Sequence, residues 1–291
     1  MEGSEGEAIV VTGATGTIGS HLVRLLSAAG ERVRAVTRRP EGREDLPGVE
    51  WVGADLADRR ALPPVFRGAG KLFLLTGNTE GMVRLQKNAI RAAAEAGVEV
   101  VIKLSALGAT DHSRSVIGLW HYNVERELRS AGPSWTVLRP HHFMQNLLDP
   151  LVLDREGGRV HSAAGDGAIP FIDTRDIAEV AAAVLTGEGH EGETYTLTGP
   201  EALSYGEATG ILSRVLGRPL TYVAESVDEA WTRRRAAGQP VWLAAAQLAI
   251  AEYQRAGGPT ERTTDTAERI TGRRPRTLER FAQDHRAALR G

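Results

Sequence analysis

The chain has 291 residues, a net charge of -2 and no cysteine, which excludes disulfides, thiolate nucleophiles and cysteine-ligated metal centres. Nearly balanced charge is not the composition of a protein that neutralises nucleic-acid phosphates, so we expect no nucleic-acid partner. The sequence contains three lysines and 32 arginines, and no lysine follows Lys103.

The first residues, Met1–Glu7, are acidic and lack the basic and apolar regions of a signal peptide. The most apolar long segment, 241–251, is shorter than the about 20 residues that a membrane-spanning helix needs. We therefore expect a cytoplasmic protein without a membrane partner.

Short apolar runs alternate with amphipathic segments through the first half of the chain. Six runs predict strands, at residues 8–12, 32–37, 49–52, 71–76, 98–105 and 135–138. Between most of them, apolar residues three and four positions apart predict helices, as at Ile18, Leu22 and Leu25. This alternation predicts an α/β fold with a doubly wound parallel Rossmann sheet, covered by helices on both faces.

The pattern changes after Pro140. We expect irregular structure over 141–166 and a helix at 177–185, with Asp173 or Thr174 as its N-cap. A strand is expected at 194–198, and helices at 228–236 and 241–254.

This change predicts two domains. We expect a Rossmann domain over residues 1–150, to which 170–199 return. A smaller, mainly helical substrate-binding lobe contains residues 200–291 and part of 141–169.

The strongest chemical signal is a glycine loop between the first predicted strand and the first predicted helix. Gly13, Gly16 and Gly19 have the spacing G-x-x-G-x-x-G. Glycines in this position allow a tight turn and bring backbone N–H groups and a helix N-terminus close to a pyrophosphate. We expect the loop to bind a dinucleotide through Gly13, Thr15, Gly16, Thr17 and Ile18.

The end of the second predicted strand favours NADPH over NADH. An NAD site usually has a carboxylate here, but this chain has Arg38 and Arg39, and its first acid is Glu41. Guanidinium groups suit a 2′-phosphate, and the alternative is that the two arginines belong to a solvated surface. After the third strand, Asp55 is a candidate for hydrogen bonding the adenine amine or for capping a helix, and Leu56 follows it.

These motifs resemble those of a known family. Thr12–Gly19, the segment Gly53–Leu56 and the run Leu138–Asn146 are similar to the NmrA-like branch of atypical short-chain dehydrogenases, among them NAD(P)H-dependent quinone, azo and triphenylmethane reductases. The resemblance covers nearly the whole chain. It implies that Thr76, Gly77 and Asn78 border the cofactor and that Pro140 and Phe143 border the nicotinamide.

The usual proton donor of short-chain dehydrogenases is missing. That donor is a Tyr-x-x-x-Lys pair, and none of the five tyrosines has a lysine four residues later. Alignment with the family places His121 where a lysine stands, and it places Ser105 or Ala106 near the usual serine. His121 is a candidate proton donor or cofactor contact, and alternatively a helix residue bonded to Glu125. Tyr122 is the second candidate catalytic residue.

Candidate substrate contacts follow the fifth and sixth predicted strands. We expect them to be Ala106, Trp120, His141, His142 and Phe143. We predict no metal site, because the histidines lack a helical ligand spacing such as H-x-x-x-H.

The sequence thus predicts an NADPH-dependent reductase that transfers hydride to a conjugated or aromatic small molecule such as a quinone, an enone or an imine-like dye. Such acceptors can take their proton from water after hydride transfer, so a missing Tyr-Lys pair need not abolish activity. The alternatives are an NADP-sensing regulator without turnover and a non-redox isomerase or cyclase. The sequence does not indicate the oligomeric state.

Overall fold

The structure, a computed structural model, describes residues 7–290 and separates the chain into two compact units. The first unit runs to Asp111 and adds Trp120–Arg139 and Ile177–Tyr195. The second contains His112–Leu119, Pro140–Asp176 and the chain from Thr196 onward. Each unit is therefore assembled from separated stretches of sequence.

A parallel sheet organises the first unit. Within residues 7–290 it has seven strands in the order β3-β2-β1-β4-β5-β6-β9. Every neighbouring pair from β3 to β6 is parallel, which confirms the doubly wound fold. The strands are β1 (Ala8–Val11), β2 (Val33–Thr37), β3 (Val49–Gly53), β4 (Ala69–Leu74), β5 (Val100–Leu104), β6 (Ser134–Pro140) and β9 (Thr194–Leu197).

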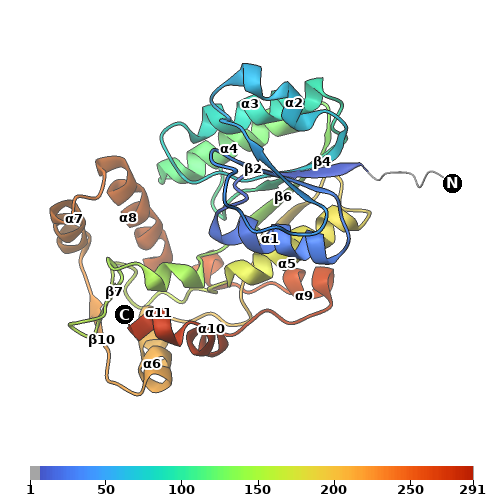
Figure 1. Cartoon of the computed structure of the whole chain (residues 1–291). Helices are drawn as coiled ribbons and strands as arrows, with labels where there is room; N and C mark the ends of the chain where they lie inside the picture. Colours follow the sequence, from blue (N-terminus) through green and yellow to red (C-terminus); the bar gives the residue numbers. More distant parts are fainter. Residues whose placement is uncertain (1–6, 291) are drawn as a thin grey trace. The chain divides into compact units, whose positions relative to one another are not determined.

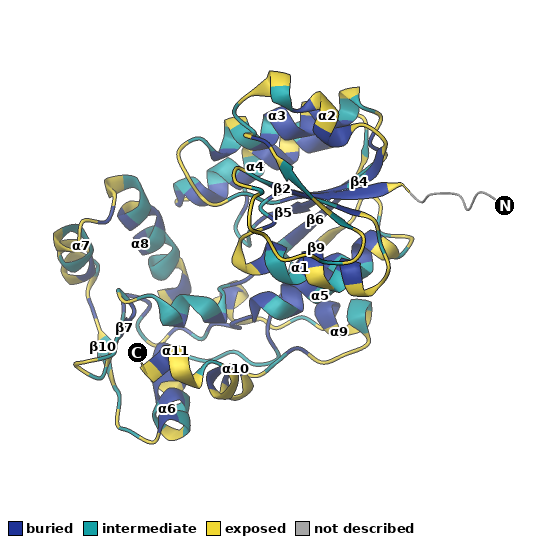
Figure 2. Cartoon of the chain, viewed as in Figure 1, coloured by how far each residue is buried: buried dark blue, intermediate teal, exposed yellow. Residues whose placement is uncertain are grey.

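The burial of these strands follows from their place in the sheet. Every residue of the central strand β1 is buried, because helices cover both faces and neighbouring strands cover both edges. This explains why its sequence is a continuous apolar run and does not alternate. The inner strand β4 is likewise coloured mainly as buried in Figure 2. The edge strand β3 has no buried residue, and its sequence includes Glu50.

Helices cover the two faces of this sheet. Helices α2, α3 and α4 lie on one face, while α1 and α5 lie on the other (Figure 1). The first face has an apolar core that includes Phe66, Leu72, Ile90 and Leu128. The helical segments are α1 (Thr17–Ala28), the 3-10 turn η1 (Arg59–Ala61), α2 (Pro63–Phe66), α3 (Met82–Glu95), α4 (Val116–Arg129) and α5 (Thr174–Thr186).

The second unit contains a small sheet that the sequence did not predict. Strands β7 (Leu153–Asp154), β8 (Arg159–Ser162) and β10 (Thr221–Ala224) have the order β10-β8-β7. The expectation of irregular structure over 141–166 is therefore wrong. The missed strand β8 pairs in parallel with β10, about sixty residues later, and local sequence carries little signal for such distant pairing.

Helices are the main secondary structure of the second unit, as predicted. Helix α6 begins at a capping box formed by Ser204 and Glu207, and its core-facing residues pack with Phe281 and Leu289. The helical segments are η2 (Met144–Leu148), α6 (Tyr205–Leu216), α7 (Val227–Ala236), α8 (Val241–Arg255), η3 (Gly258–Glu261), α9 (Thr266–Thr271), α10 (Leu278–Asp284) and α11 (Arg286–Arg290).

Asp173 has the capping role proposed for it. Its carboxylate accepts a hydrogen bond from the backbone N–H of Arg175 at 2.9 Å, and it pairs with the Arg175 guanidinium at 2.6 Å. Both interactions hold the start of α5. Among the helices of residues 7–290, none is long and apolar enough to cross a membrane.

Candidate active site

The carboxyl ends of the parallel strands bring several predicted site residues to one edge of the sheet. The glycine loop follows β1, Arg38 follows β2, Asp55 follows β3, Thr76 follows β4 and Ser105 follows β5. Ligands of open α/β sheets bind at this edge.

The glycine loop is a close-packed turn. Gly13 has a φ of +63°, and a Cβ atom there would lie 2.8 Å from the carbonyl oxygen of Leu75. A Cβ on Gly19 would overlap the carbonyl oxygen of Gly13. The buried Thr12 side chain fixes the loop to the end of β4, since its hydroxyl donates to the Leu75 carbonyl and accepts from the Leu75 N–H, both at 2.9 Å. Side chains at Gly13 and Gly19 would therefore distort the loop.

The loop leads into a helix end that suits an anion. Gly16 is the N-cap of α1, no side chain caps the helix, and its first turn contains no acidic residue. Thr15, Gly16 and Thr17 are exposed, whereas Ile18 is buried. The partial positive charge at this helix end is thus not compensated by a side chain. These residues fit the pyrophosphate of a dinucleotide.

Arg38 and Arg39 are both exposed beyond β2. Within residues 7–290 neither guanidinium has a hydrogen bond or an ion pair, and the Thr37 hydroxyl contacts only the backbone of Arg39. Each guanidinium therefore has all its donors available for a phosphate.

Helix α3 holds two of the loops at this edge. Gln86 donates to the Thr76 hydroxyl at 2.8 Å, and Asn88 donates to the Leu56 carbonyl at 2.9 Å. Both donors are buried, so they fix the loops after β4 and β3. The exposed Asp55 accepts from the N–H of Ala57 at 2.8 Å within a turn, but it caps no helix, because the N-cap of η1 is Asp58. Gly77 and Asn78 are exposed.

A buried ion-pair cluster lies beyond β5. The Glu125 carboxylate, on α4, accepts from the Ser105 hydroxyl at 2.6 Å and from Arg139 Nε and Nη2 at 2.9 and 2.6 Å. Arg129 adds a further contact at 3.1 Å. Burial alone raises the pKa of Glu125, but the hydrogen bonds from Arg139 and Ser105 hold it below its usual value. Glu125 is therefore an anion that anchors Ser105.

His121 has a different partner from the one considered in the sequence. Its Nδ1 lies 2.9 Å from Nζ of Lys103, while Glu125 is occupied by Ser105 and the two arginines. Lys103 is completely buried on β5, and His121 is 6 % exposed. Lys103 was not among the predicted site residues, because the Tyr-x-x-x-Lys pattern concerns only a lysine four residues after a tyrosine. A lysine inside the apolar strand Val100–Leu104 was the available signal.

Burial is the largest influence on the pKa of both members of this pair. Burial lowers the pKa of Lys103 to about 7, with Glu125 opposing the shift and Arg139 adding to it. Burial, Lys103 and Arg139 lower the pKa of His121 well below its usual value. The imidazole is therefore neutral at physiological pH.

The other predicted residues of the first unit are partly buried. Tyr122 neighbours His121 on α4, and the Arg126 guanidinium lies 5.9 Å from the centre of its ring. Ala106 and Trp120 are also partly buried.

The remaining predicted contacts belong to the second unit. Pro140 and His141 are buried, and Phe143 forms a bridge with Ile172. His142 Nε2 lies 3.1 Å from the Asn146 amide and 3.2 Å from the Tyr205 hydroxyl. Burial lowers the pKa of His141 to about 4 and that of His142 to about 3. Both imidazoles are neutral and serve as hydrogen-bonding groups.

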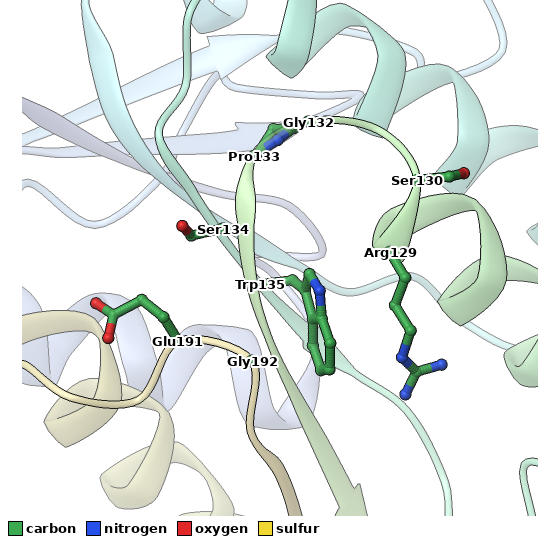
Figure 3. A pocket seen from close by; sticks show the side chains of 8 residues that line it. All are labelled: Arg129, Ser130, Gly132, Pro133, Ser134, Trp135, Glu191 and Gly192. Carbon is green, nitrogen blue, oxygen red and sulfur yellow. The ribbon is translucent and has the colours of Figure 1, made fainter.

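An open cleft of about 560 Å³ lies at the opposite end of β6. Arg129 and Trp135 face it, with the guanidinium 4.7 Å from the ring centre (Figure 3). Its wall includes Ser134, the first residue of β6, so the cleft is at the amino end of the strand and away from the glycine loop. Over residues 7–290 no group of three or more histidine and acidic side chains is arranged to hold a metal ion.

The chain is similar to known proteins over almost its whole length. Residues 5–254 match the NmrA-like family. The chain is 37% identical over 286 residues to an NAD(P)H azoreductase of Xenophilus azovorans, covering 97% of this chain and 99% of that protein. The chain belongs to the NmrA-like family.

Two further members of this group are informative. A (4-alkanoyl-5-oxo-2,5-dihydrofuran-3-yl)methyl phosphate reductase of Streptomyces griseus is 38% identical over 284 residues, covering 97% of this chain and 99% of the relative. The NADPH-dependent quinone oxidoreductase of Escherichia coli, solved with NADPH, is 27% identical with a TM-score of 0.84, covering 96% of this chain and 99% of that one. The similarity extends over both units.

Proposed function

We propose that this protein is an NADPH-dependent reductase that transfers hydride to a conjugated or aromatic acceptor such as a quinone, an enone or an imine-like dye. The observation that carries the proposal is the uncapped, glycine-lined N-terminus of α1, together with two unpaired arginines at the end of the neighbouring strand β2. The names of the related reductases support the same reaction class. We place this activity in the cytoplasm.

The chain's own residues have distinct roles in this proposal. The backbone of Gly13–Ile18 and the N-terminus of α1 hold the pyrophosphate, and Arg38 and Arg39 hold the 2′-phosphate. Bound NADPH supplies the hydride. Thr76, held by Gln86, fixes the loop beside the cofactor site. The glycine loop therefore binds the pyrophosphate, and the two arginines select NADPH. The hydrogen bonds from Gln86 and Asn88 of α3 orient the loops that border the site.

His121 is the proposed proton donor. Its imidazole is neutral and its Nδ1 is engaged by Lys103, so the free nitrogen, Nε2, is the one that can carry a transferable proton. Tyr122, the other sequence candidate, stays a prediction. The predicted acceptor contacts Ala106, Trp120, His141, His142 and Phe143 also stay predictions.

Cofactor selection tests the proposal directly. In the double variant Arg38→Ala/Arg39→Ala, NADPH binding should weaken at least about tenfold, because charge-assisted hydrogen bonds to the 2′-phosphate are lost, each contributing about 1.5–3 kcal/mol. NADH binding should change little. Isothermal titration calorimetry with both cofactors measures the two affinities.

The matched control is Arg214→Ala/Arg286→Ala, which removes the same charge from the second unit and should leave both affinities unchanged. Equal losses for NADPH and NADH in the Arg38/Arg39 variant would contradict the assigned preference. Turnover tests the reductase itself: a protein that binds NADPH but oxidises it no faster than buffer, across quinones, enones and azo dyes, is a sensor and not a reductase.

A further inference from the structure

Lys103 is a cationic side chain in an unusual place. It is completely buried in β5, a central strand of the sheet, whereas the other two lysines reach the surface. Burying an ammonium group costs free energy unless its donors are satisfied, and an apolar side chain would fill the same space without that cost. Packing therefore does not account for Lys103.

The contacts of the ammonium group point to His121. Nζ donates to the Leu104 carbonyl at 2.9 Å and lies 2.9 Å from Nδ1 of His121. A protonated lysine has only donors, so Nδ1 must accept, and the neutral imidazole then carries its hydrogen on Nε2. Within residues 7–290 the imidazole has no other hydrogen bond.

We propose that Lys103 is the positioning residue and proton reserve of His121: it keeps the hydrogen of the imidazole on Nε2 and replaces that proton when His121 gives it to the reduced acceptor. The inference rests on the proposed function, because it assigns the source of the proton for the same reaction.

The proton transfer balances without a charged imidazole. The Nε2–H bond breaks as a bond to hydrogen forms on the basic atom of the reduced acceptor, whose lone pair takes the proton. At the same time the Nζ–H bond breaks and an Nδ1–H bond forms, which leaves Lys103 as a neutral amine. After product release, Nε2 takes a proton from water and Nδ1 returns one to Nζ. Because Lys103 has no exposed surface, its proton passes through the imidazole.

The surroundings allow this exchange near neutral pH. The charged groups acting on Lys103 are Glu125, from α4, and Arg139, from β6, and the adjacent strand β4 presents the apolar Phe73 and Leu74. Burial is the largest influence and brings the pKa of Lys103 to about 7. Lys103 is therefore protonated below about pH 7 and loses its proton as the pH rises above that value.

Nitrogen-15 NMR of the histidine-labelled protein with NADPH bound tests the assignment without turnover, and His121→Gln identifies the resonances. We expect Nδ1 of His121 to be the unprotonated nitrogen at pH 6 and its resonance to shift with a midpoint near pH 7. In Lys103→Met this shift should disappear, and in Lys87→Met, a control at a partly exposed position of α3, it should remain. No shift of Nδ1 between pH 5.5 and 9 in the unmodified protein would overturn the proposal, even if no variant folds.

Kinetics separates this inference from the proposed function. With an enone acceptor, Lys103→Met should slow turnover about tenfold to hundredfold and lose the fall in rate above pH 7. Lys103→Arg keeps a cation that does not release its proton, so it should retain the tautomer yet still turn over slowly. An unchanged pH profile in Lys103→Met would overturn the proton reserve while the reductase stands. Absence of NADPH oxidation by the unmodified protein would contradict the proposed reductase function. The NMR measurement would still test the contact between Lys103 and His121.

Discussion

The two units each contain a buried polar cluster, and the clusters differ in charge. The first unit has the ammonium of Lys103, the carboxylate of Glu125 and the guanidinium of Arg139 packed around His121. The second has His142 bonded to neutral Asn146 and Tyr205, and the charged side chain that acts on both His142 and Tyr205 is Arg234.

Both clusters keep their imidazoles neutral, so the pKa of histidine alone does not distinguish them. The difference is the presence of a second titratable group near neutrality. Lys103 has a pKa of about 7, whereas burial raises the pKa of Tyr205 above its usual value and so holds its proton. Only the first cluster can release and regain a proton at physiological pH, and the second can only donate or accept fixed hydrogen bonds.

Removing the carboxylate of the first cluster should give the largest effect. In Glu125→Ala the buried donors of Arg139 and Ser105 lose their acceptor, and breaking a buried ion pair costs about 3–5 kcal/mol. Urea unfolding measures the loss of free energy of unfolding. The control is Glu127→Ala on the same helix, whose partners Lys87 and Arg91 are partly exposed and which should cost at most about 1 kcal/mol. Similar losses in the two variants would remove the contrast between buried and surface charge.

Acid should destabilise the second cluster through His142. Its pKa is about 3 in the folded protein and about 6.5 when unfolded, so the unfolded state binds more protons between these values. The stabilisation from the neutral imidazole is fully present above pH 6.5 and is lost as the pH falls toward 3. At pH 5 the loss of free energy of unfolding is about 2 kcal/mol.

Denaturation at pH 7 and pH 5 measures this loss. His142→Gln should reduce the difference between the two pH values, while His112→Gln, at an exposed position, should leave it as it is. An equal pH dependence in the His142 variant and the unmodified protein would show that the neutral histidine is not the source of the acid sensitivity.

Removing one neutral hydrogen bond of the second cluster should give the smallest effect. Tyr205→Phe deletes the hydroxyl that contacts His142 and keeps the ring that packs edge-on against Phe171. We expect a loss of about 1 kcal/mol in thermal or urea unfolding. Tyr253→Phe, at a ring that is 53% exposed, is the control and should have almost no effect. A loss as large as that of Glu125→Ala would show that the second cluster is as tightly coupled as the charged one.

The sequence by itself determined the features that depend on neighbouring residues. The six apolar runs correspond to β1–β6, because a strand in a parallel sheet covered on both faces must be apolar along its length. Gly13 and Gly19 predicted the loop from their spacing. Gly13 suits a left-handed turn against Leu75, and Gly19 suits the close approach of α1 to the loop. Asp173 predicted the start of α5, because an N-cap side chain bonds the backbone within the first turn of its helix.

Only the tertiary structure decided which polar groups meet. Lys103 and His121 are 18 residues apart in the sequence, and they are in contact because the fold brings α4 next to β5. Glu125 lies one helical turn after His121 in the sequence, so a hydrogen bond between them was a reasonable prediction. In the structure the Glu125 carboxylate is bonded by Arg139 from β6. The pairing of β8 with β10 was hidden for the same reason. Contacts between distant segments depend on burial and register across elements, and no local pattern of residues specifies them.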